Sequence, residues 1–167
     1  MAATATADQP MPLSAFPQST LQIATPDARL HRFNIWIAND DRHRAQGLMF
    51  IKDLPADAGM LFIYPQPHRI AMWMKNTLIP LDMLFIRADG RVAKVIANAK
   101  PLSLDNIESC APPPNSELLP PERSMHCADP REDVTGVLEL KGGIAATLNI
   151  RKGAMVMHSF FGTIPNQ

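Results

Sequence analysis

Apolar residues in this chain come in short runs, and a Gly or a Pro stands at or near the end of most of them. Short runs with this punctuation predict buried strands, because a helix of a small domain needs a longer periodic stretch. The chain is therefore expected to fold mostly as β-sheet. The predicted strands cover residues 31–37, 59–64, 70–75, 81–86, 91–97, 134–140 and 154–158.

Two of these strands are predicted to form an antiparallel hairpin. Residues 81–86 and 91–97 flank Ala88-Asp89-Gly90, a short connection in which Gly supplies the positive φ of a tight turn. Several strands are apolar on both faces, and the simplest way to bury them is a sheet that curls on itself. We expect an α+β, mostly β fold with a single small barrel-like antiparallel sheet of about seven strands.

Two short helices are expected beside this sheet. The first follows Asp40, whose side-chain oxygens can cap the free N–H groups of a first helical turn. Gly47 is expected inside this helix, where it costs about 1 kcal/mol relative to Ala unless close packing requires it. The second helix is expected over residues 144–150, directly after Gly143.

The length of 167 residues favours one domain, and 46% hydrophobic residues can build a core. Prolines concentrate outside the predicted strands, because four lie in residues 1–30 and seven in residues 101–130. We expect residues 1–30 to form a flexible N-terminal arm. Residues 31–167 are expected to form the β-rich domain, with a proline-rich surface loop over residues 101–130.

The chain carries 16 basic and 16 acidic residues, so its formal net charge is zero. A nucleic-acid binder needs excess positive charge to neutralise phosphates, so nucleic acid is not an expected partner. No apolar stretch reaches the roughly 18 residues of a membrane-spanning helix. The first residues also lack the charged start and apolar stretch of a secretory signal, which indicates either a cytoplasmic protein or a mature form.

Signatures of common enzyme classes are absent from the sequence: it contains no Gly-x-Ser-x-Gly, no Walker loop, no Gly-x-Gly-x-x-Gly and no His-Glu-x-x-His. The five histidines are scattered, and an isolated histidine is more typical of a structural or surface position than of a catalytic base. The sequence therefore favours a non-enzymatic protein without a cofactor. An uncharacterised enzyme that uses the polar cluster described next is a further hypothesis, ranked after the binding module and the copper-binding protein given below.

Polar residues in and near the predicted strands at 70–75 and 81–86 form the first candidate site. Its candidate ligand-binding residues are Arg44, Trp73, Lys75, Asn76, Thr77 and Asp82. Asp82 has apolar neighbours, and a buried carboxylate is costly unless it is paired, so Arg44 and Lys75 are its predicted partners. In one interpretation these groups converge on a ligand, with Arg44 in bidentate contact with a carboxylate or phosphate. In the other they form an internal ion pair and a turn cap that fix strand register.

Methionines form a second candidate site. Its candidate metal ligands are Met72, Met74, Met155, Met157 and His158, with Met125-His126-Cys127 as a further cluster. Thioether, imidazole and thiolate groups suit copper(I), and alternation along a strand places both methionines of a pair on one face. Methionine also fills cores adaptably, so packing is the competing and favoured explanation.

Three motifs follow one another along the chain. They are Arg44-Ala45-Gln46-Gly47-Leu48-Met49-Phe50, Gly59-Met60-Leu61-Phe62 and Trp73-Met74-Lys75-Asn76-Thr77-Leu78-Ile79-Pro80-Leu81-Asp82. With the Asp89-Gly90 hairpin and the unit from Val137 to Gly153, they resemble the bacterial and archaeal domain of unknown function 192 (DUF 192) family over roughly residues 31–158. The resemblance implies a small β-rich domain of an exported protein, with no established reaction, and hence a periplasmic or secreted location.

An exported location would favour a disulfide between Cys110 and Cys127, whereas both would stay thiols in the cytoplasm. The chain-entropy estimate for closing such a loop is about 3 kcal/mol of stabilisation. We expect a non-enzymatic, extracytoplasmic binding or accessory module that holds a small polar ligand or a peptide. The alternative is a soft-metal, copper-binding protein that uses Met, His and Cys.

Overall fold

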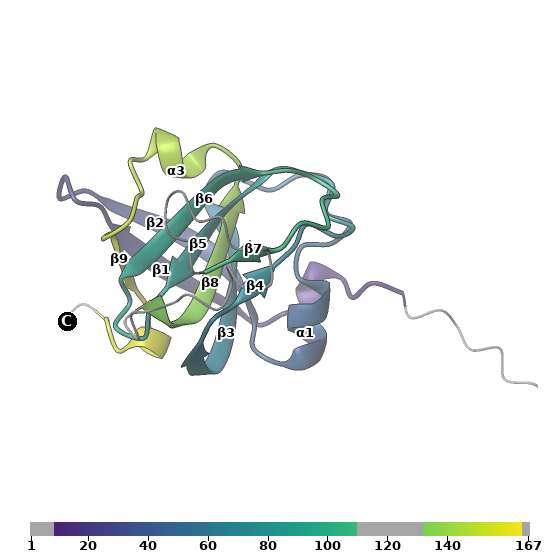
Figure 1. Cartoon of the computed structure of the whole chain (residues 1–167), viewed down its shortest axis with the longest axis horizontal. Helices are drawn as coiled ribbons and strands as arrows, with labels where there is room; N and C mark the ends of the chain where they lie inside the picture. The colour runs from purple at the N-terminus through teal and green to yellow at the C-terminus, as the bar shows by residue number, and fades with distance from the viewer. Residues whose placement is uncertain (1–8, 110–131, 165–167) are drawn as a thin grey trace, which may run out of the picture.

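The computed structural model describes residues 9–109 and 132–164. Seven strands form one sheet in the order β6-β5-β8-β3-β2-β1-β9, and this sheet curls into a half-barrel (Figure 1). Its strands are β1 (Gln18–Ala24), β2 (Leu30–Ala38), β3 (Ala58–His68), β5 (Leu81–Ile86), β6 (Val92–Ala99), β8 (Val134–Lys141) and β9 (Met155–Met157). A small second sheet pairs β4 (Ala71–Met72) with β7 (Ile107–Glu108). The helical elements are η1 (Leu13–Ala15), α1 (Asp41–Gln46), α3 (Ile144–Thr147) and η3 (Ser159–Phe161).

The two end strands of the sheet, β6 and β9, meet at one corner. A β-bridge joins Arg91 to Met155 there. The Val92 N–H donates to the carbonyl oxygen of Ala154 at 2.8 Å, beside this bridge. The predicted mostly β, barrel-like fold is therefore confirmed, as a sheet that closes only partly.

The prediction of an antiparallel sheet is wrong for one pair of strands. β2 and β3 run parallel, whereas the other neighbours in the sheet are antiparallel. The connection from β2 to β3 contains α1, and a crossover of this length can return the chain to the same end of the sheet. The order of strand, helix and strand along the sequence is itself typical of a parallel pair.

The predicted hairpin of residues 81–86 and 91–97 is confirmed, since β5 and β6 pair antiparallel. Asp40 caps α1, accepting a hydrogen bond of 2.8 Å from the N–H of His43. Gly47 does not lie inside α1 but follows it, with φ of 52°. A Cβ at Gly47 would also lie 2.8 Å from the Phe62 ring. Both the backbone conformation and the close packing therefore require glycine.

The prediction of a flexible arm over residues 1–30 is wrong for residues 18–24. These residues form β1, which pairs with β2 and with β9. Leu21 and Ile23 point into the core and are buried, while their neighbours along the strand are more exposed. Pro17 and Pro26 stand outside the strand, so they bound it rather than interrupt it.

Two predicted segments differ from the structure. The strand expected over residues 70–75 is limited to Ala71–Met72. Its partner, Ile107–Glu108, lies in the segment expected to be a surface loop, of which the structure describes residues 101–109. Within the described ranges, no helix is long and apolar enough to cross a bilayer.

Two apolar clusters cover the two faces of the sheet. The inner cluster, inside the curl, includes Ile23, Phe33, Leu61, Leu84, Leu138 and Val156. The outer cluster, next to α1 and β4, includes Leu48, Met60, Phe62, Met74, Met83 and Val137. The central strands β5 and β8 are buried on both faces. A polar side chain on either strand must therefore find its partner inside the protein.

Candidate functional site

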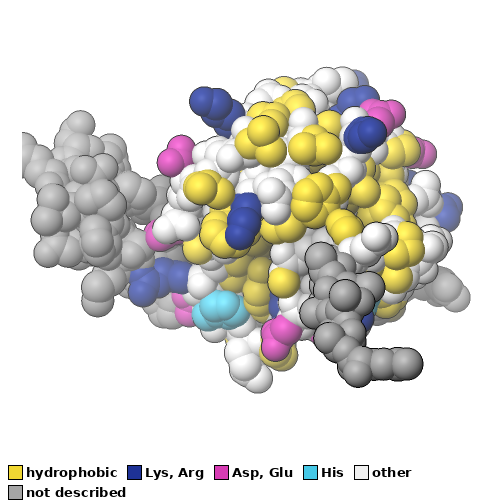
Figure 2. All heavy atoms as spheres, turned by 90° about the vertical axis from the view of Figure 1, so that its right-hand side faces the viewer, with side chains coloured by type: hydrophobic (Ala, Val, Ile, Leu, Met, Phe, Trp, Pro, Cys, Tyr) yellow, Lys and Arg dark blue, Asp and Glu magenta, His cyan; other side chains and the backbone are white. Residues whose placement is uncertain are grey.

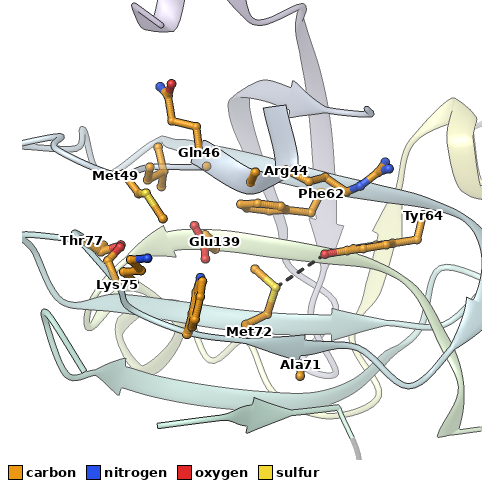
Figure 3. Close-up of a pocket in the computed structure, with 14 residues that line it drawn as sticks. Arg44, Gln46, Met49, Phe62, Tyr64, Ala71, Met72, Lys75, Thr77 and Glu139 are labelled. Atoms are coloured by element: carbon orange, nitrogen blue, oxygen red, sulfur yellow. Dashed lines mark hydrogen bonds between the residues drawn. The ribbon is translucent and has the colours of Figure 1, made fainter. Parts of the chain in front are cut away.

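A pocket opens on the outer face of the sheet, between α1, β3, β4 and residues 73–77 (Figure 3). It is lined by Arg44, Ala45, Gln46, Gly47, Leu48, Met49, Phe62, Tyr64, Ala71, Met72, Trp73, Lys75, Thr77 and Glu139. Its volume is about 100 Å³, room for about three water molecules at liquid density. Pockets for drug-sized ligands hold about 300–1,000 Å³. This pocket can therefore accept a small group or the end of a side chain.

Glu139 provides the carboxyl group at the centre of this pocket. On β8 it stands opposite Met60 of β3 and Met83 of β5, and its side chain is 4% exposed. Burial raises the pKa of Glu139 from 4.5 to about 8, because the charged form loses its hydration. Within the described residues no hydrogen bond or ion pair reaches the carboxyl group, which points between the lining side chains in Figure 3. Its protonated form can both donate and accept a hydrogen bond.

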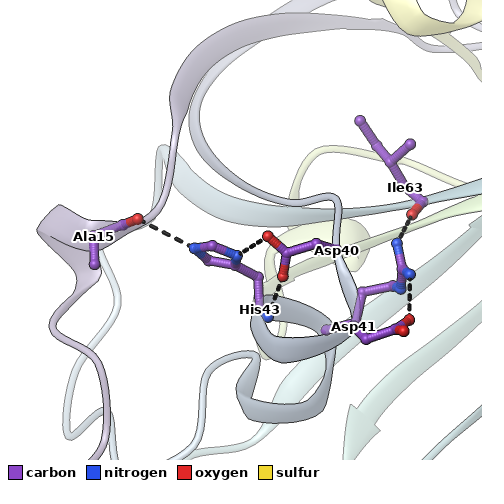
Figure 4. Close-up of polar contacts among 6 residues, drawn as sticks. Ala15, Asp40, Asp41, His43 and Ile63 are labelled. Atoms are coloured by element: carbon purple, nitrogen blue, oxygen red, sulfur yellow. Dashed lines mark hydrogen bonds and ion pairs between the residues drawn. The ribbon is translucent and has the colours of Figure 1, made fainter.

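Arg44 lines the pocket, but its two terminal nitrogens are engaged. Its Nη1 donates to the carbonyl oxygen of Ile63 at 2.7 Å, and its Nη2 donates to Oδ1 of Asp41 at 2.8 Å (Figure 4). The guanidinium lies 5.2 Å from the centre of the Tyr64 ring. Burial raises the pKa of Tyr64 to about 12, opposed by Arg44 and reinforced by Glu139. A bidentate contact between Arg44 and a ligand would have to replace contacts that already exist.

Lys75 supplies a second cation beside the pocket. Its ammonium group lies 5.2 Å from the centre of the Trp73 ring, within the range of a cation–π contact. Within the described part of the chain it makes no ion pair. The hydroxyl of the buried Thr77 donates to the carbonyl oxygen of Lys75 at 3.2 Å and stabilises the turn. Lys75 is therefore available to an anion that enters the pocket.

The segment before β1 is tied to α1, the helix that lines one side of the pocket. The Nε2 of His43 lies 3.2 Å from the carbonyl oxygen of Ala15, and its Nδ1 lies 2.6 Å from Oδ2 of Asp40 (Figure 4). The side-chain amide of Gln46 exchanges two hydrogen bonds of 2.7 Å with the backbone of Met11. These contacts fix the position of α1 relative to the sheet.

Asp82 does not line the pocket. It stands opposite Leu140 on β8, so it faces the inner side of the sheet. Its Oδ1 accepts hydrogen bonds from the N–H groups of Asn98 at 2.8 Å and Gly143 at 3.1 Å, and its Oδ2 accepts one from Ala145 at 2.8 Å. The turn cap of the structural interpretation is therefore observed. The predicted ion pair is not, because backbone N–H groups satisfy the buried carboxylate instead.

Asn76 also lies outside the pocket lining. Its φ is 53°, and its carbonyl oxygen accepts a hydrogen bond of 2.9 Å from the N–H of Phe50. Its side chain approaches the sulfur of Met49 at 4.0 Å. The structure therefore brings together four of the six predicted ligand-binding residues and separates two from them. Those in the pocket are Arg44, Trp73, Lys75 and Thr77.

Sequence reasoning missed the central residue of the pocket, Glu139. The signal was present, because Glu139 stands in an apolar strand just as Asp82 does. Tyr64, the only tyrosine, was also missed. Its position at the end of an apolar run gave no indication that a helix from elsewhere in the chain would pack over it.

The candidate metal ligands do not form one set. Met72 lines the pocket, while Met74 is fully buried in the outer cluster. The two methionines of β9 lie at the far end of the sheet, beside β1. The Nε2 of His158 lies 3.0 Å from Oγ of Ser19, and its Nδ1 accepts a hydrogen bond of 3.2 Å from the N–H of Phe160. Both ring nitrogens are thus engaged inside the protein.

Some predicted residues fall outside the described ranges. The disulfide between Cys110 and Cys127 and the Met125-His126-Cys127 cluster both lie there. In residues 9–109 and 132–164, no group of three or more His, Cys, Asp or Glu side chains is placed to hold a metal ion.

The chain matches the DUF192 family, described as uncharacterized, over residues 22–158. No protein of curated function matches it at a significant level. It is similar to a protein from Sinorhizobium meliloti 1021 whose crystal structure is described as that of a candidate transcription regulator. The two share 32% sequence identity with a TM-score of 0.72, and the match covers 87% of this chain and 96% of that one. It is also similar to a protein of unknown function from Novosphingobium aromaticivorans DSM 12444, with 28% identity, a TM-score of 0.71, and coverage of 92% and 94%. Because the family match spans most of its length, this chain belongs to the DUF192 family.

Proposed function

We propose that this protein is a non-enzymatic binding module that holds the carboxylate of a small ligand or of a peptide in the Glu139 pocket. The observation that carries the proposal is the buried carboxyl group of Glu139, which has no partner among the described residues. The group borders the pocket, so a ligand can pair with it without displacing a hydrogen bond between described residues.

The charges around the pocket favour a carboxylate. Because its pKa is about 8, Glu139 is mostly protonated at neutral pH and can donate an O–H···O⁻ bond, which is among the stronger hydrogen bonds. Lys75 adds a positive charge beside Trp73. Arg44 contributes less, since its charge is shared with Asp41. A cationic ligand would meet both of these basic side chains.

The extracytoplasmic location implied by the resemblance belongs to this proposal. Fractionation of cells that express the complete gene would test it. Recovery in the periplasm or medium is expected, and recovery only in the cytosol would contradict the location without affecting the pocket.

Ligand binding can be tested by NMR with acetate, propionate and acetamide as probes. Millimolar acetate and propionate should shift the signals of Met72 and Thr77 saturably, and acetamide should bind more weakly because it lacks the charge. The variant Glu139→Leu should lose these shifts. Absence of saturable shifts with every probe would contradict the proposal.

Protein stability gives an independent measurement. Glu139→Leu should raise the free energy of unfolding by about 1–3 kcal/mol, because it replaces a largely desolvated carboxyl group with an apolar side chain of similar size. The matched control is Asp82→Asn on the paired strand. It should lower stability by about 2–4 kcal/mol, through weakened hydrogen bonds to a charged group, while acetate binding is retained. A destabilised Glu139→Leu that still binds acetate would assign Glu139 a purely structural role.

A further inference from the structure

Three loops beside the pocket are hydrogen-bonded to one another. They are residues 47–57, 73–80 and 100–106. The N–H of Phe50 donates to the carbonyl oxygen of Asn76 at 2.9 Å, which joins the first loop to the second. The N–H of Leu102 donates to the carbonyl oxygen of Thr77 at 3.0 Å, which joins the third loop to the second. The three loops therefore form one continuous surface.

This surface is unusually apolar. Seven large hydrophobic side chains are exposed in the described part of the chain, and five of them lie on these three loops. We call these five residues the loop face: Phe50, Trp73, Leu78, Leu102 and Leu104. In Figure 2, which views the right-hand side of Figure 1, hydrophobic side chains gather with Lys and Arg side chains between them. Exposed apolar side chains that gather on one side of a protein are typical of interaction sites.

The backbone presents two of these side chains in a costly conformation. Phe50 has φ of 65° and Leu102 has φ of 63°, a region that bulky residues rarely occupy. Each such residue costs about 1–3 kcal/mol and persists only where surrounding contacts hold it. Both N–H groups are held by the hydrogen bonds between loops. The loops thus keep two large apolar side chains in water in a conformation that Gly or Asn would adopt more easily.

The loop face and the pocket share one residue. Trp73 lines the pocket and is also 48% exposed, and its ring contacts Lys75. A ligand that fills only the pocket would leave the rest of the loop face in water. A peptide can place one side chain in the pocket and cover the loop face with its neighbours, as an anchor residue does in other interfaces.

We infer that the loop face and the pocket together bind a protein segment in which a carboxylate, from an acidic side chain or from a C-terminus, is flanked by apolar residues. This inference rests on the proposed function and adds the class of partner. The carboxylate meets Glu139 and Lys75, and the flanking apolar residues cover Trp73, Leu102 and Leu104. The basic and acidic residues of the three loops are equal in number, which favours a peptide over an anionic lipid surface.

Three synthetic peptides test the inference with the full chain. The first is a blocked peptide Leu-Phe-Asp-Leu-Phe, the second has Asn in place of Asp, and the third is a blocked Leu-Phe-Leu with a free C-terminal carboxylate. The acidic peptides should bind at least tenfold more tightly than propionate, because burial of each apolar side chain contributes about tenfold or more. The Asn peptide should bind more weakly than the Asp peptide. Comparison of the first and third peptides identifies the source of the carboxylate.

Two variants separate the loop face from the pocket. Leu102→Asn should weaken peptide binding about tenfold and leave propionate binding unchanged. Its stability should be equal or higher, because Asn tolerates the positive φ at this position. The matched control is Leu30→Asn, since Leu30 is 61% exposed but lies on β2, outside the three loops. This control should not change peptide binding.

The outcomes distinguish the inference from the proposed function. Propionate binding without tighter peptide binding would overturn the inference and leave the pocket function intact. Loss of binding for every probe would overturn both. Sedimentation with phosphatidylglycerol vesicles, without peptide binding, would assign the loop face to lipid and also overturn the inference. Equal losses in Leu102→Asn and Leu30→Asn would show that the loop face has no special role.

Discussion

Asp82 and Glu139 show how much the surroundings of a buried carboxyl group determine its role. Both lie on strands β5 and β8, and both have apolar neighbours in the sequence. Asp82 accepts three backbone hydrogen bonds, so it stabilises the turns around it. Glu139 accepts none from the described residues and faces a pocket. The rule that selected Asp82 from the sequence applies equally to Glu139, but it cannot tell which group has partners.

The raised pKa of Glu139 predicts a pH dependence of stability. Because its pKa is about 8 in the folded protein and about 4.5 when exposed, the folded state binds an extra proton between these values. The free energy of unfolding should therefore fall as pH rises from 4.5 to about 8, by up to about 1.4 kcal/mol per pH unit. Urea unfolding at several pH values measures this slope.

Glu139→Gln is the control for this measurement, since its amide does not titrate. The difference in unfolding free energy between the parent protein and Glu139→Gln isolates the contribution of this carboxyl group from that of other titrating residues. A difference that is constant from pH 5 to pH 8 would contradict a raised pKa at Glu139.

At the scale of elements, the sequence predicted best the strands that are rich in apolar residues and have Gly or Pro near their ends. β5, β6 and β8 belong to this class, and the structure contains them close to their predicted bounds. β1 was missed because the prolines on either side of it were taken to interrupt any strand. Leu21 and Ile23 nevertheless alternate with polar residues, as expected for a strand with one buried face. The parallel pairing of β2 with β3 was missed because a mostly antiparallel sheet was predicted and no pair of strands was assigned as parallel.

A core substitution in β1 tests its place in the sheet. Ile23→Ala should lower the free energy of unfolding by about 2–5 kcal/mol, because Ile23 is fully buried in the inner cluster. A flexible arm would give no change. Thr20→Ala, also on β1 but exposed, is the control and should change stability by no more than about 1 kcal/mol. Chemical denaturation measures both variants.

At the scale of the whole molecule, the sheet separates the face that holds Asp82 from the face that holds the pocket. The inner face holds Asp82 and the apolar cluster inside the curl, whereas the outer face holds Glu139 beneath α1 and β4. All three DUF192-like motifs contribute to the outer face: the first supplies α1 residues, the second Phe62, and the third Trp73 and Lys75. The family motifs thus coincide with the pocket.

This separation predicts that the two carboxyl groups act independently. The changes in unfolding free energy caused by Asp82→Asn and Glu139→Gln should add to within about 0.5 kcal/mol in the double variant, because the side chains face opposite sides of the sheet and share no partner. A double-mutant cycle measures the coupling. A coupling well above this value would indicate that strand positions shift when either group is changed.

The sequence by itself determined the β-rich fold class, the β5–β6 hairpin, both short helices and the family, because apolar period, turn residues and motif order are local properties of the chain. It also selected four residues that meet in the pocket. Only the tertiary structure decided that Asp82 and Glu139 face opposite sides of one sheet, that α1 covers Glu139, and that three loops form one apolar surface. The physical reason is that solvation and hydrogen-bond partners are set by residues distant in sequence, which strand pairing and helix packing bring together.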